Sequence, residues 1–181
     1  DCAQRGVDMD PLDPFVNFTM GRTYWLEGDL DRSLSWLERA TSLSPNYAQG
    51  IYAQAWTEFM ADTTVSARQH VDLAMQLSPL DPLYYAMLSL RGLTHLAAGD
   101  DQIGAEWAER GARTPGAHAL IAMIAAAAQA LAGNHKNARR WAAEVRNRNP
   151  ALTLDDFFNA FPMKSELMRQ RVTAALELLG F

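Results

Sequence analysis

The side chains that most often bind metals are few in this chain and are spread along its whole length. The four histidines are His70, His95, His118 and His135, and the single cysteine is Cys2. A zinc or similar site needs several such ligands at short spacings or brought together from neighbouring segments. No histidine has a second ligand type at such a spacing, so we predict no metal site. A single cysteine also excludes a disulfide within the chain.

Residues that could act as acids, bases or nucleophiles show no catalytic pattern either. The sequence contains no glycine-rich phosphate loop and no nucleophile elbow. Two adjacent pairs of acids, Asp100 with Asp101 and Asp155 with Asp156, come directly before segments with helical patterning. Carboxylates are favoured at helix N-termini because the helix dipole is positive there, so we interpret both pairs as capping residues. We therefore expect no enzyme activity, no catalytic residue and no bound cofactor.

Charge is distributed unevenly over the 181 residues, whose formal net charge is −5. Residues 1–81 hold 12 acids and 5 bases, whereas residues 82–181 hold 9 acids and 11 bases. We interpret the one local basic run as the solvated face of a helix, and contact with a nucleic acid through residues 136–148 is the alternative. This run consists of Lys136, Arg139, Arg140, Arg146 and Arg148.

The bulk composition is that of a globular protein, with 49% hydrophobic and 20% charged residues. No uninterrupted apolar run approaches the roughly 18 residues that a membrane span requires. The first residues do not show the basic and apolar regions of a signal peptide. We expect a cytoplasmic protein that does not contact a membrane.

The elements that position these side chains are indicated by an internal repeat. Pro11, Pro45 and Pro79 are each 34 residues apart. Two further series keep the same period with one three-residue insertion between Ala74 and Gly99. A period of this length indicates stacked supersecondary units, each of which buries its apolar face against its neighbours. The two series are Ala40, Ala74, Gly111 and Val145, and Gly28, Gly99 and Gly133.

Start and stop signals within each unit predict two helices joined by a short turn. Gly28 suits the left-handed position after a helix, and Asp29 is a typical N-cap of the next one. We expect the same junction at Ala61-Asp62, Gly99-Asp100 and Gly133-Asn134. In Asp13-Pro14 and Asp81-Pro82 we expect an N-cap acid followed by proline at the first helical position, where the missing N–H is not needed.

The residues at these offsets resemble the tetratricopeptide repeat (TPR) family. The first unit carries Gly21, Tyr24, Gly28, Ala40 and Pro45 at the expected places. The resemblance implies an all-α fold, a right-handed α-solenoid of stacked antiparallel helix hairpins (a TPR superhelix) with a C-terminal capping helix. The implied boundaries are 1–11 for the tail of a preceding repeat helix, 12–45, 46–79, 80–116 and 117–150 for four repeats, the third with a longer first helix, and 151–181 for the cap.

The segment after Pro150 is expected to cover the end of the last repeat. Phe157, Phe158 and Phe161 predict a buried aromatic cluster. In the last helix one stripe is apolar, and Arg169, Arg171 and Glu177 lie elsewhere, where we expect them to face water. The stripe consists of Met168, Val172, Ala175, Leu176 and Leu179.

The resemblance also implies a binding site, because four first-helix positions of each TPR line a concave groove. In the first repeat these positions hold Phe15, Phe18, Arg22 and Trp25, and in the second they hold Gln49, Tyr52, Trp56 and Phe59. An aromatic-lined groove is expected to bind a hydrophobic peptide or helix, or an adjacent domain of the same chain, since aromatic anchors dominate interface energetics. The alternative is that these side chains only pack between helices. The later repeats supply mainly Ala, Leu and Met: Ala86, Ser89, Leu93 and Leu96, then Leu120, Met123, Ala127 and Ala130.

The function expected from these features is a non-enzymatic protein–protein interaction and regulatory module. The chain is also similar to the C-terminal repeat regions of bacterial multidomain regulators, in which repeats follow a class III nucleotide cyclase domain or a winged-helix DNA-binding domain. That resemblance implies the regulatory segment of a larger bacterial signalling protein. Homo-oligomerisation, with the groove filled by a second copy, is the other alternative.

Overall fold

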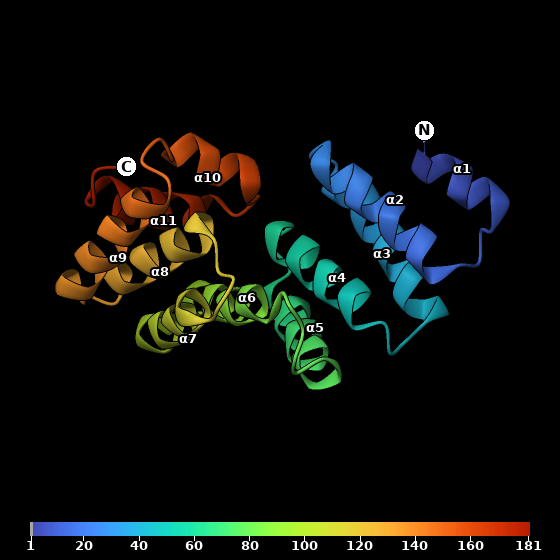
Figure 1. The fold of residues 1–181 in the computed structure, drawn as a ribbon, viewed down its shortest axis with the longest axis horizontal. Helices are drawn as coiled ribbons and strands as arrows, with labels where there is room; N and C mark the ends of the chain where they lie inside the picture. Colours follow the sequence, from blue (N-terminus) through green and yellow to red (C-terminus); the bar gives the residue numbers. More distant parts are fainter. Residues whose placement is uncertain (1) are drawn as a thin grey trace. The chain divides into compact units, whose positions relative to one another are not determined.

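The computed structural model describes residues 2–181, and every regular element in that range is an α-helix (Figure 1). The chain divides into two compact units, one of residues up to Pro79 and one of Leu80–Phe181. The predicted all-α fold of antiparallel helix hairpins is confirmed.

The first unit contains a short leading helix followed by two hairpins. In each hairpin the two helices are joined by three residues and pack against each other, and α3 also packs against α4. The helix α1 packs against α2. The bounds are α1 Cys2–Met9, α2 Pro14–Leu26, α3 Leu30–Leu43, α4 Ala48–Met60 and α5 Thr64–Leu77.

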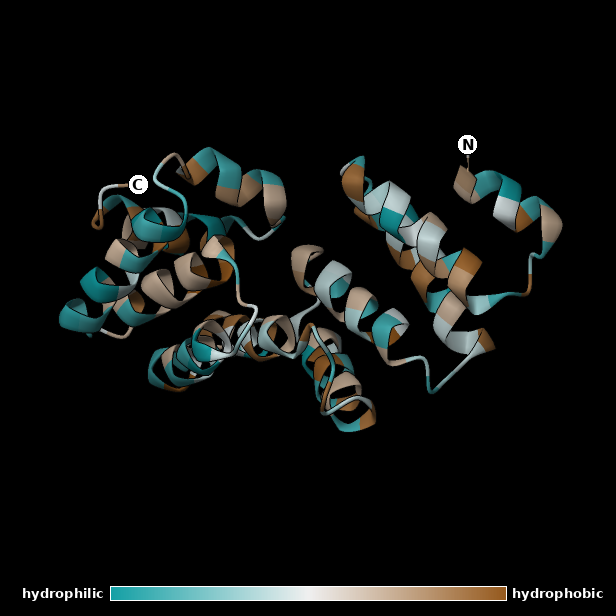
Figure 2. Cartoon of the chain, viewed as in Figure 1, coloured by the Kyte–Doolittle hydropathy of each residue, from teal (hydrophilic) through white to brown (hydrophobic). Residues whose placement is uncertain are grey.

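The second unit contains two further hairpins and two C-terminal helices. The helices α6 and α7 form one hairpin, α8 and α9 form the other, and α11 packs on α8. Figure 2 shows the contrast within the second hairpin, where α9 is largely hydrophilic and α8 is largely hydrophobic. The bounds are α6 Tyr84–Ala97, α7 Asp101–Arg113, α8 Ala119–Leu131, α9 His135–Arg148, α10 Leu154–Ala160 and α11 Glu166–Glu177.

The two similar Asp-Pro phrases start their helices differently. Asp13 is the N-cap of α2 as predicted, with its Oδ1 accepting the Val16 N–H at 2.8 Å and Pro14 as the first helical residue. The prediction is wrong for Asp81-Pro82. There the carboxylate accepts the N–H of Leu83 at 2.8 Å, which forms a tight turn, and α6 begins only at Tyr84.

The three inserted residues are shared between a loop and a helix. The link 78–83 has six residues where the link 44–47 has four. The helix α6 has 14 residues where α4 has 13. The lengthening of this first helix therefore amounts to one residue.

The left-handed residue between α4 and α5 is not a glycine. Gly28, Gly99 and Gly133 have φ of 78°, 84° and 74°, and Asp62 adopts the same conformation with φ of 70°. Asp62, and not Ala61, is thus the structural equivalent of Gly28, which shifts the predicted junction by one residue. A short polar side chain tolerates this conformation better than most, although at a cost that glycine avoids.

The predicted acid pairs act as caps in only one of the two places. Asp156 forms a capping box with Thr153 at the start of α10, and its hydrogen bonds with Thr153 lower the pKa of the Asp156 carboxyl. Asp100 stands at the N-cap position of α7 without a side-chain cap bond, and its carboxylate lies 3.3 Å from His95 Nδ1. Asp101 forms an ion pair with Arg171. Asp100 and Asp101 therefore lie at the helix N-terminus as predicted, but neither makes a side-chain capping hydrogen bond there.

The C-terminal segment buries most of the apolar residues predicted to be buried, although Phe158 and Leu179 are only partly buried. The stripe residues Met168, Val172, Ala175 and Leu176 are buried, and the ring of Phe157 contacts those of Phe158 and Phe161 with centroids 5.4 and 5.0 Å apart. Arg171 does not simply face water, because its guanidinium donates to the carbonyl oxygen of Leu96 at the end of α6.

No helix within residues 2–181 is long and apolar enough to cross a membrane. In the same range, no group of three or more His, Cys, Asp or Glu side chains is arranged to hold a metal ion.

Candidate partner-binding surface

Aromatic side chains of α2 and α4 form a partly exposed cluster in the first unit. Phe15 and Phe18, three residues apart on α2, have ring centroids separated by 6.0 Å. Phe18 also meets Tyr47 edge to face, at 5.6 Å and an interplanar angle of 77°. Phe15 is 61% exposed, which is unusual for so large an apolar side chain. We define the aromatic surface as Phe15, Phe18, Arg22, Trp25, Tyr47 and Tyr52.

Arg22 places a positive charge among these rings. Its guanidinium carbon lies 5.2 Å from the centroid of the Trp25 ring, a cation–π distance. Burial lowers the pKa of Arg22 below its usual value, and the nearby Tyr52 opposes this shift. Within residues 2–181 no carboxylate pairs with Arg22 and no oxygen accepts a hydrogen bond from it. A half-buried cation is therefore balanced only by aromatic rings.

Tyr47 adds a second donor to the aromatic surface. It occupies the N-cap position of α4, and its hydroxyl is buried without a hydrogen-bond partner among the described residues. Burial, and to a lesser extent the charge of Asp13, raises the pKa of this phenol. Sequence reasoning missed Tyr47 because it precedes the helical positions that were considered. Gly50 leaves room for the ring, because a Cβ at that position would lie 2.6 Å from the Tyr47 side chain.

The eight predicted groove residues do not share one environment. On α2, Phe15 is exposed, and Phe18, Arg22 and Trp25 are half-buried. On α4, Gln49 is exposed and Tyr52 is half-buried, whereas Trp56 and Phe59 are only 5% and 4% exposed. Trp56 and Phe59 are thus part of the protein core in this structure, and six of the predicted residues retain accessible surface.

The comparisons with known proteins concern the fold. No family model matches the sequence, and no curated protein is significantly similar to it. Among solved structures, PilW, a type IV pilus biogenesis factor, superimposes with a TM-score of 0.75 at 16% identity over 97% of this chain and 82% of its own. TTC0263, a TPR protein of Thermus thermophilus, superimposes with a TM-score of 0.69 at 16% identity, over 97% of this chain and 87% of its own. YrrB, a TPR protein with an unusual peptide-binding site, superimposes with a TM-score of 0.64 at 13% identity, over 98% of this chain and 92% of its own.

The fold is the tetratricopeptide repeat fold. At these identities the likeness extends to the fold alone. The second repeat departs from the usual TPR pattern at Glu58, which stands where an aromatic residue is usual and is buried.

Glu58 is accommodated by a chain of polar contacts across α3, α4 and α5. Its carboxylate lies 2.8 Å from His70 Nδ1 and accepts the Gln54 side-chain N–H at 3.1 Å. The Thr41 hydroxyl in turn donates to Gln54 Oε1 at 2.8 Å. Buried polar groups are tolerated when they are paired in this way. We assign this network to the stability of the second TPR.

The equivalent first-helix positions of the later TPRs are almost all buried. In α6 they hold Ala86, Ser89, Leu93 and Leu96, all of which are buried. In α8 every residue from Ile121 to Ala130 is buried, and α11 packs on this helix. Among these positions of the described residues, only Leu120 on α8 keeps accessible surface, so the later repeats add little exposed apolar area.

The predicted basic run is largely engaged within the second unit. Arg140 pairs with Glu109 at 2.6 Å and Arg148 pairs with Glu144 at 2.8 Å. Arg146 donates to the carbonyl oxygen of Leu179 at 2.6 Å. These bonds satisfy part of the positive charge that a nucleic acid would need to attract.

Proposed function

We propose that this chain is a non-enzymatic interaction module whose aromatic surface binds a hydrophobic segment of a protein. Arg22 carries the proposal, because its half-buried guanidinium has no acceptor among the described residues. A partner segment that offers a carboxylate or carbonyl oxygen would supply that acceptor. The TPR fold supports this reading, and the fold-mate YrrB is a TPR protein with a peptide-binding site.

The energetics favour a segment that is mainly apolar. Phe15, Phe18 and Trp25 keep accessible aromatic area, and burying it contributes about 25 cal/mol per Å². A hydrogen bond to a charged donor such as Arg22 contributes about 1.5–3 kcal/mol. We therefore propose a segment with two apolar anchors beside an oxygen acceptor, and a carboxylate fits the single positive charge best.

The test is selection of a random peptide library displayed on phage against the wild-type protein. We expect enriched peptides with apolar residues next to Asp or Glu. Arg22→Gln should weaken their binding about 10-fold or more, given the strength of a charged hydrogen bond. Gln49→Ala is the matched control, because Gln49 is exposed and lies outside the aromatic surface. Peptides that bind equally well to Arg22→Gln and Phe18→Ala proteins would contradict the proposal.

Self-association is the competing use of the same surface. A second copy would cover Phe15 and Phe18, and the mass from light scattering would double as concentration rises. Phe15→Asp should then abolish the change in mass. A mass that stays that of a monomer at high concentration would exclude self-association and favour a different protein as the partner of the aromatic surface.

The larger context of the chain remains a proposal based on sequence resemblance. We propose that the module serves a bacterial signalling regulator, with either an adjacent domain or a separate protein as its partner. Sequencing the gene on both sides of this region tests that context. A cyclase or winged-helix domain there would support it, and its absence would favour an independent adaptor.

A further inference from the structure

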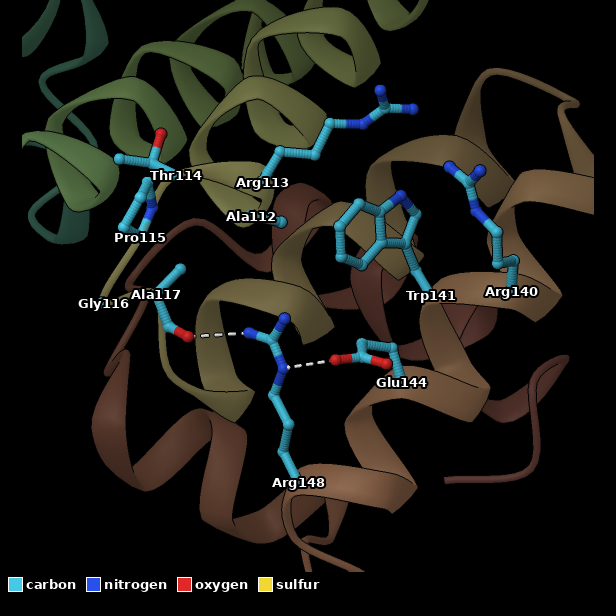
Figure 3. Close-up of a pocket in the computed structure, with 10 residues that line it drawn as sticks. All are labelled: Ala112, Arg113, Thr114, Pro115, Gly116, Ala117, Arg140, Trp141, Glu144 and Arg148. Atoms are coloured by element: carbon cyan, nitrogen blue, oxygen red, sulfur yellow. Dashed lines mark hydrogen bonds and ion pairs between the residues drawn. The ribbon is translucent and has the colours of Figure 1, made fainter.

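A pocket of about 530 Å³ lies in the second unit between the end of α7, the loop that follows it and α9 (Figure 3). None of its residues belongs to the aromatic surface. Its walls combine three arginines with small and apolar residues. The lining residues are Ala112, Arg113, Thr114, Pro115, Gly116, Ala117, Arg140, Trp141, Glu144 and Arg148.

Positive charge exceeds negative charge around this pocket by one. Three guanidinium groups line it, and two carboxylates bind them. Glu109 Oε1 lies 2.6 Å from both Arg113 and Arg140, and Glu144 lies 2.8 Å from Arg148. Arg113 and Arg140 each use one terminal nitrogen in these bonds, and their other N–H groups have no acceptor within residues 2–181. The arrangement therefore retains hydrogen-bond donors and one unbalanced charge.

Trp141 provides a donor that the protein itself leaves unused. Its side chain lines the pocket and the residue is only 6% exposed. The indole Nε1 is buried and has no hydrogen-bond partner among the described residues. In Figure 3 this nitrogen is at the ring edge nearest the guanidinium groups of Arg113 and Arg140. A buried N–H without an acceptor is destabilising, and an oxyanion bound at this nitrogen would remove that penalty.

The neighbouring loop supports a site for negative charge. His118 follows Ala117 of the pocket wall, and burial together with the positive charge of Arg148 lowers the pKa of its imidazole. The helix α8 starts at Ala119, two residues after Ala117 of the pocket wall, and the dipole of a helix is positive at its N-terminus.

We propose that this arginine–tryptophan pocket binds a carboxylate group presented by an acidic peptide segment. The single excess charge matches a monoanionic carboxylate better than a phosphate dianion. Two guanidinium groups and one indole N–H line the pocket, and the planar guanidinium group can donate two parallel hydrogen bonds to a carboxylate. Pro115, Ala117 and the Trp141 ring give apolar contact to the atoms that carry the group. The pocket shares no residue with the aromatic surface, so an experiment that disproves one of the two proposals leaves the other intact.

The test uses the indole N–H signals of the full chain in ¹H–¹⁵N spectra. The chain has five tryptophans, and Trp141→Phe identifies the signal of Trp141. The probe is an N-acetylated hexaglutamate amide, compared with the hexaglutamine peptide and with inorganic phosphate. We expect a saturable shift of the Trp141 signal with hexaglutamate only.

Two variants decide whether the pocket is responsible. Arg140→Gln should weaken binding about 10-fold or more, because it removes a charged donor. Arg139→Gln, which removes the same charge from the adjacent α9 position outside the pocket, should leave binding within about twofold. Arg113→Gln replaces Arg140→Gln if the latter fails to give a folded spectrum. Equal losses in the Arg139 and Arg140 variants, no saturable shift, or a shift with phosphate but not with hexaglutamate would each overturn the proposal.

Discussion

His70 Nδ1 lies 2.8 Å from Oε2 and 3.0 Å from Oε1 of Glu58, so a half-buried imidazole faces a buried carboxylate between α5 and α4. The hydrogen bond to Glu58 raises the pKa of His70 above its usual value of 6.5, burial opposes the shift, and the charges of Glu58 and Glu38 add to it. The stability that this pair contributes to the first unit therefore depends on pH.

The first prediction concerns the pH dependence of stability. Because the pKa of His70 is higher in the folded chain than in the unfolded chain, the pair stabilises fully below about pH 6.5. Its contribution is lost as the pH rises through the folded pKa. His70→Gln should therefore lower the unfolding midpoint in urea most at about pH 6, and the difference from wild type should shrink toward about pH 9. His135→Gln, at an exposed position of α9, is the control and should give no such trend.

The second prediction separates core from surface among the aromatic residues. Trp56 is buried, so Trp56→Ala should lower the free energy of unfolding by about 3–5 kcal/mol through the cavity it leaves. Phe15 is largely exposed, and Phe15→Ala should change the same quantity by less than about 0.5 kcal/mol. Urea denaturation followed by circular dichroism measures both. A small effect of Trp56→Ala on the free energy of unfolding would mean that Trp56 is not part of the core and is accessible to a partner.

The sequence predicted the helix hairpins well because their signals are local. The Gly28-Asp29 junction and the Asp13-Pro14 start each depend on adjacent residues, and the 34-residue period repeats such local signals along the chain. The third repeat was harder, since Asp81 can cap a helix or close a turn with the same carboxylate. Asp62 was misplaced because alignment by residue type favours Ala61-Asp62, whereas the backbone places the left-handed residue one position later.

The candidate surface was predicted only in part because burial depends on distant residues. Periodicity places Trp25 and Phe59 at equivalent positions of two repeats, yet Trp25 is half-buried and Phe59 is buried. Arg171 falls on the polar face of its helix by pattern, but its ion pair is with Asp101, 70 residues earlier. No spacing rule connects residues so far apart. The pocket at Trp141 likewise joins the end of α7 to α9 and has no signature in either segment alone.

The third prediction tests the left-handed position of Asp62. Such a conformation destabilises the folded chain by about 1–2 kcal/mol at a non-glycine residue. Glycine avoids this cost but gives the unfolded chain more conformational freedom, which lowers the free energy of unfolding by about 0.4–1 kcal/mol. Asp62→Gly should therefore raise the free energy of unfolding by about 0.5–1 kcal/mol. Ala61→Gly, at an ordinary φ of −82°, should lower it by a similar amount. If both variants shift the urea midpoint in the same direction, backbone conformation does not control stability here.

The fourth prediction concerns the attachment of α11 within the second unit. Arg171 joins this helix to the Leu96 carbonyl oxygen at the end of α6 and to Asp101 at the start of α7. Hydrogen bonds of a charged donor contribute about 1.5–3 kcal/mol, so Arg171→Met should increase amide hydrogen exchange throughout Glu166–Glu177. Gln170→Met, at an exposed neighbouring position, should leave exchange unchanged. Because α11 packs on α8, faster exchange should extend to Ala119–Leu131 if the two helices open together. Unchanged protection of α11 in the Arg171 variant would mean that the apolar stripe alone holds the helix.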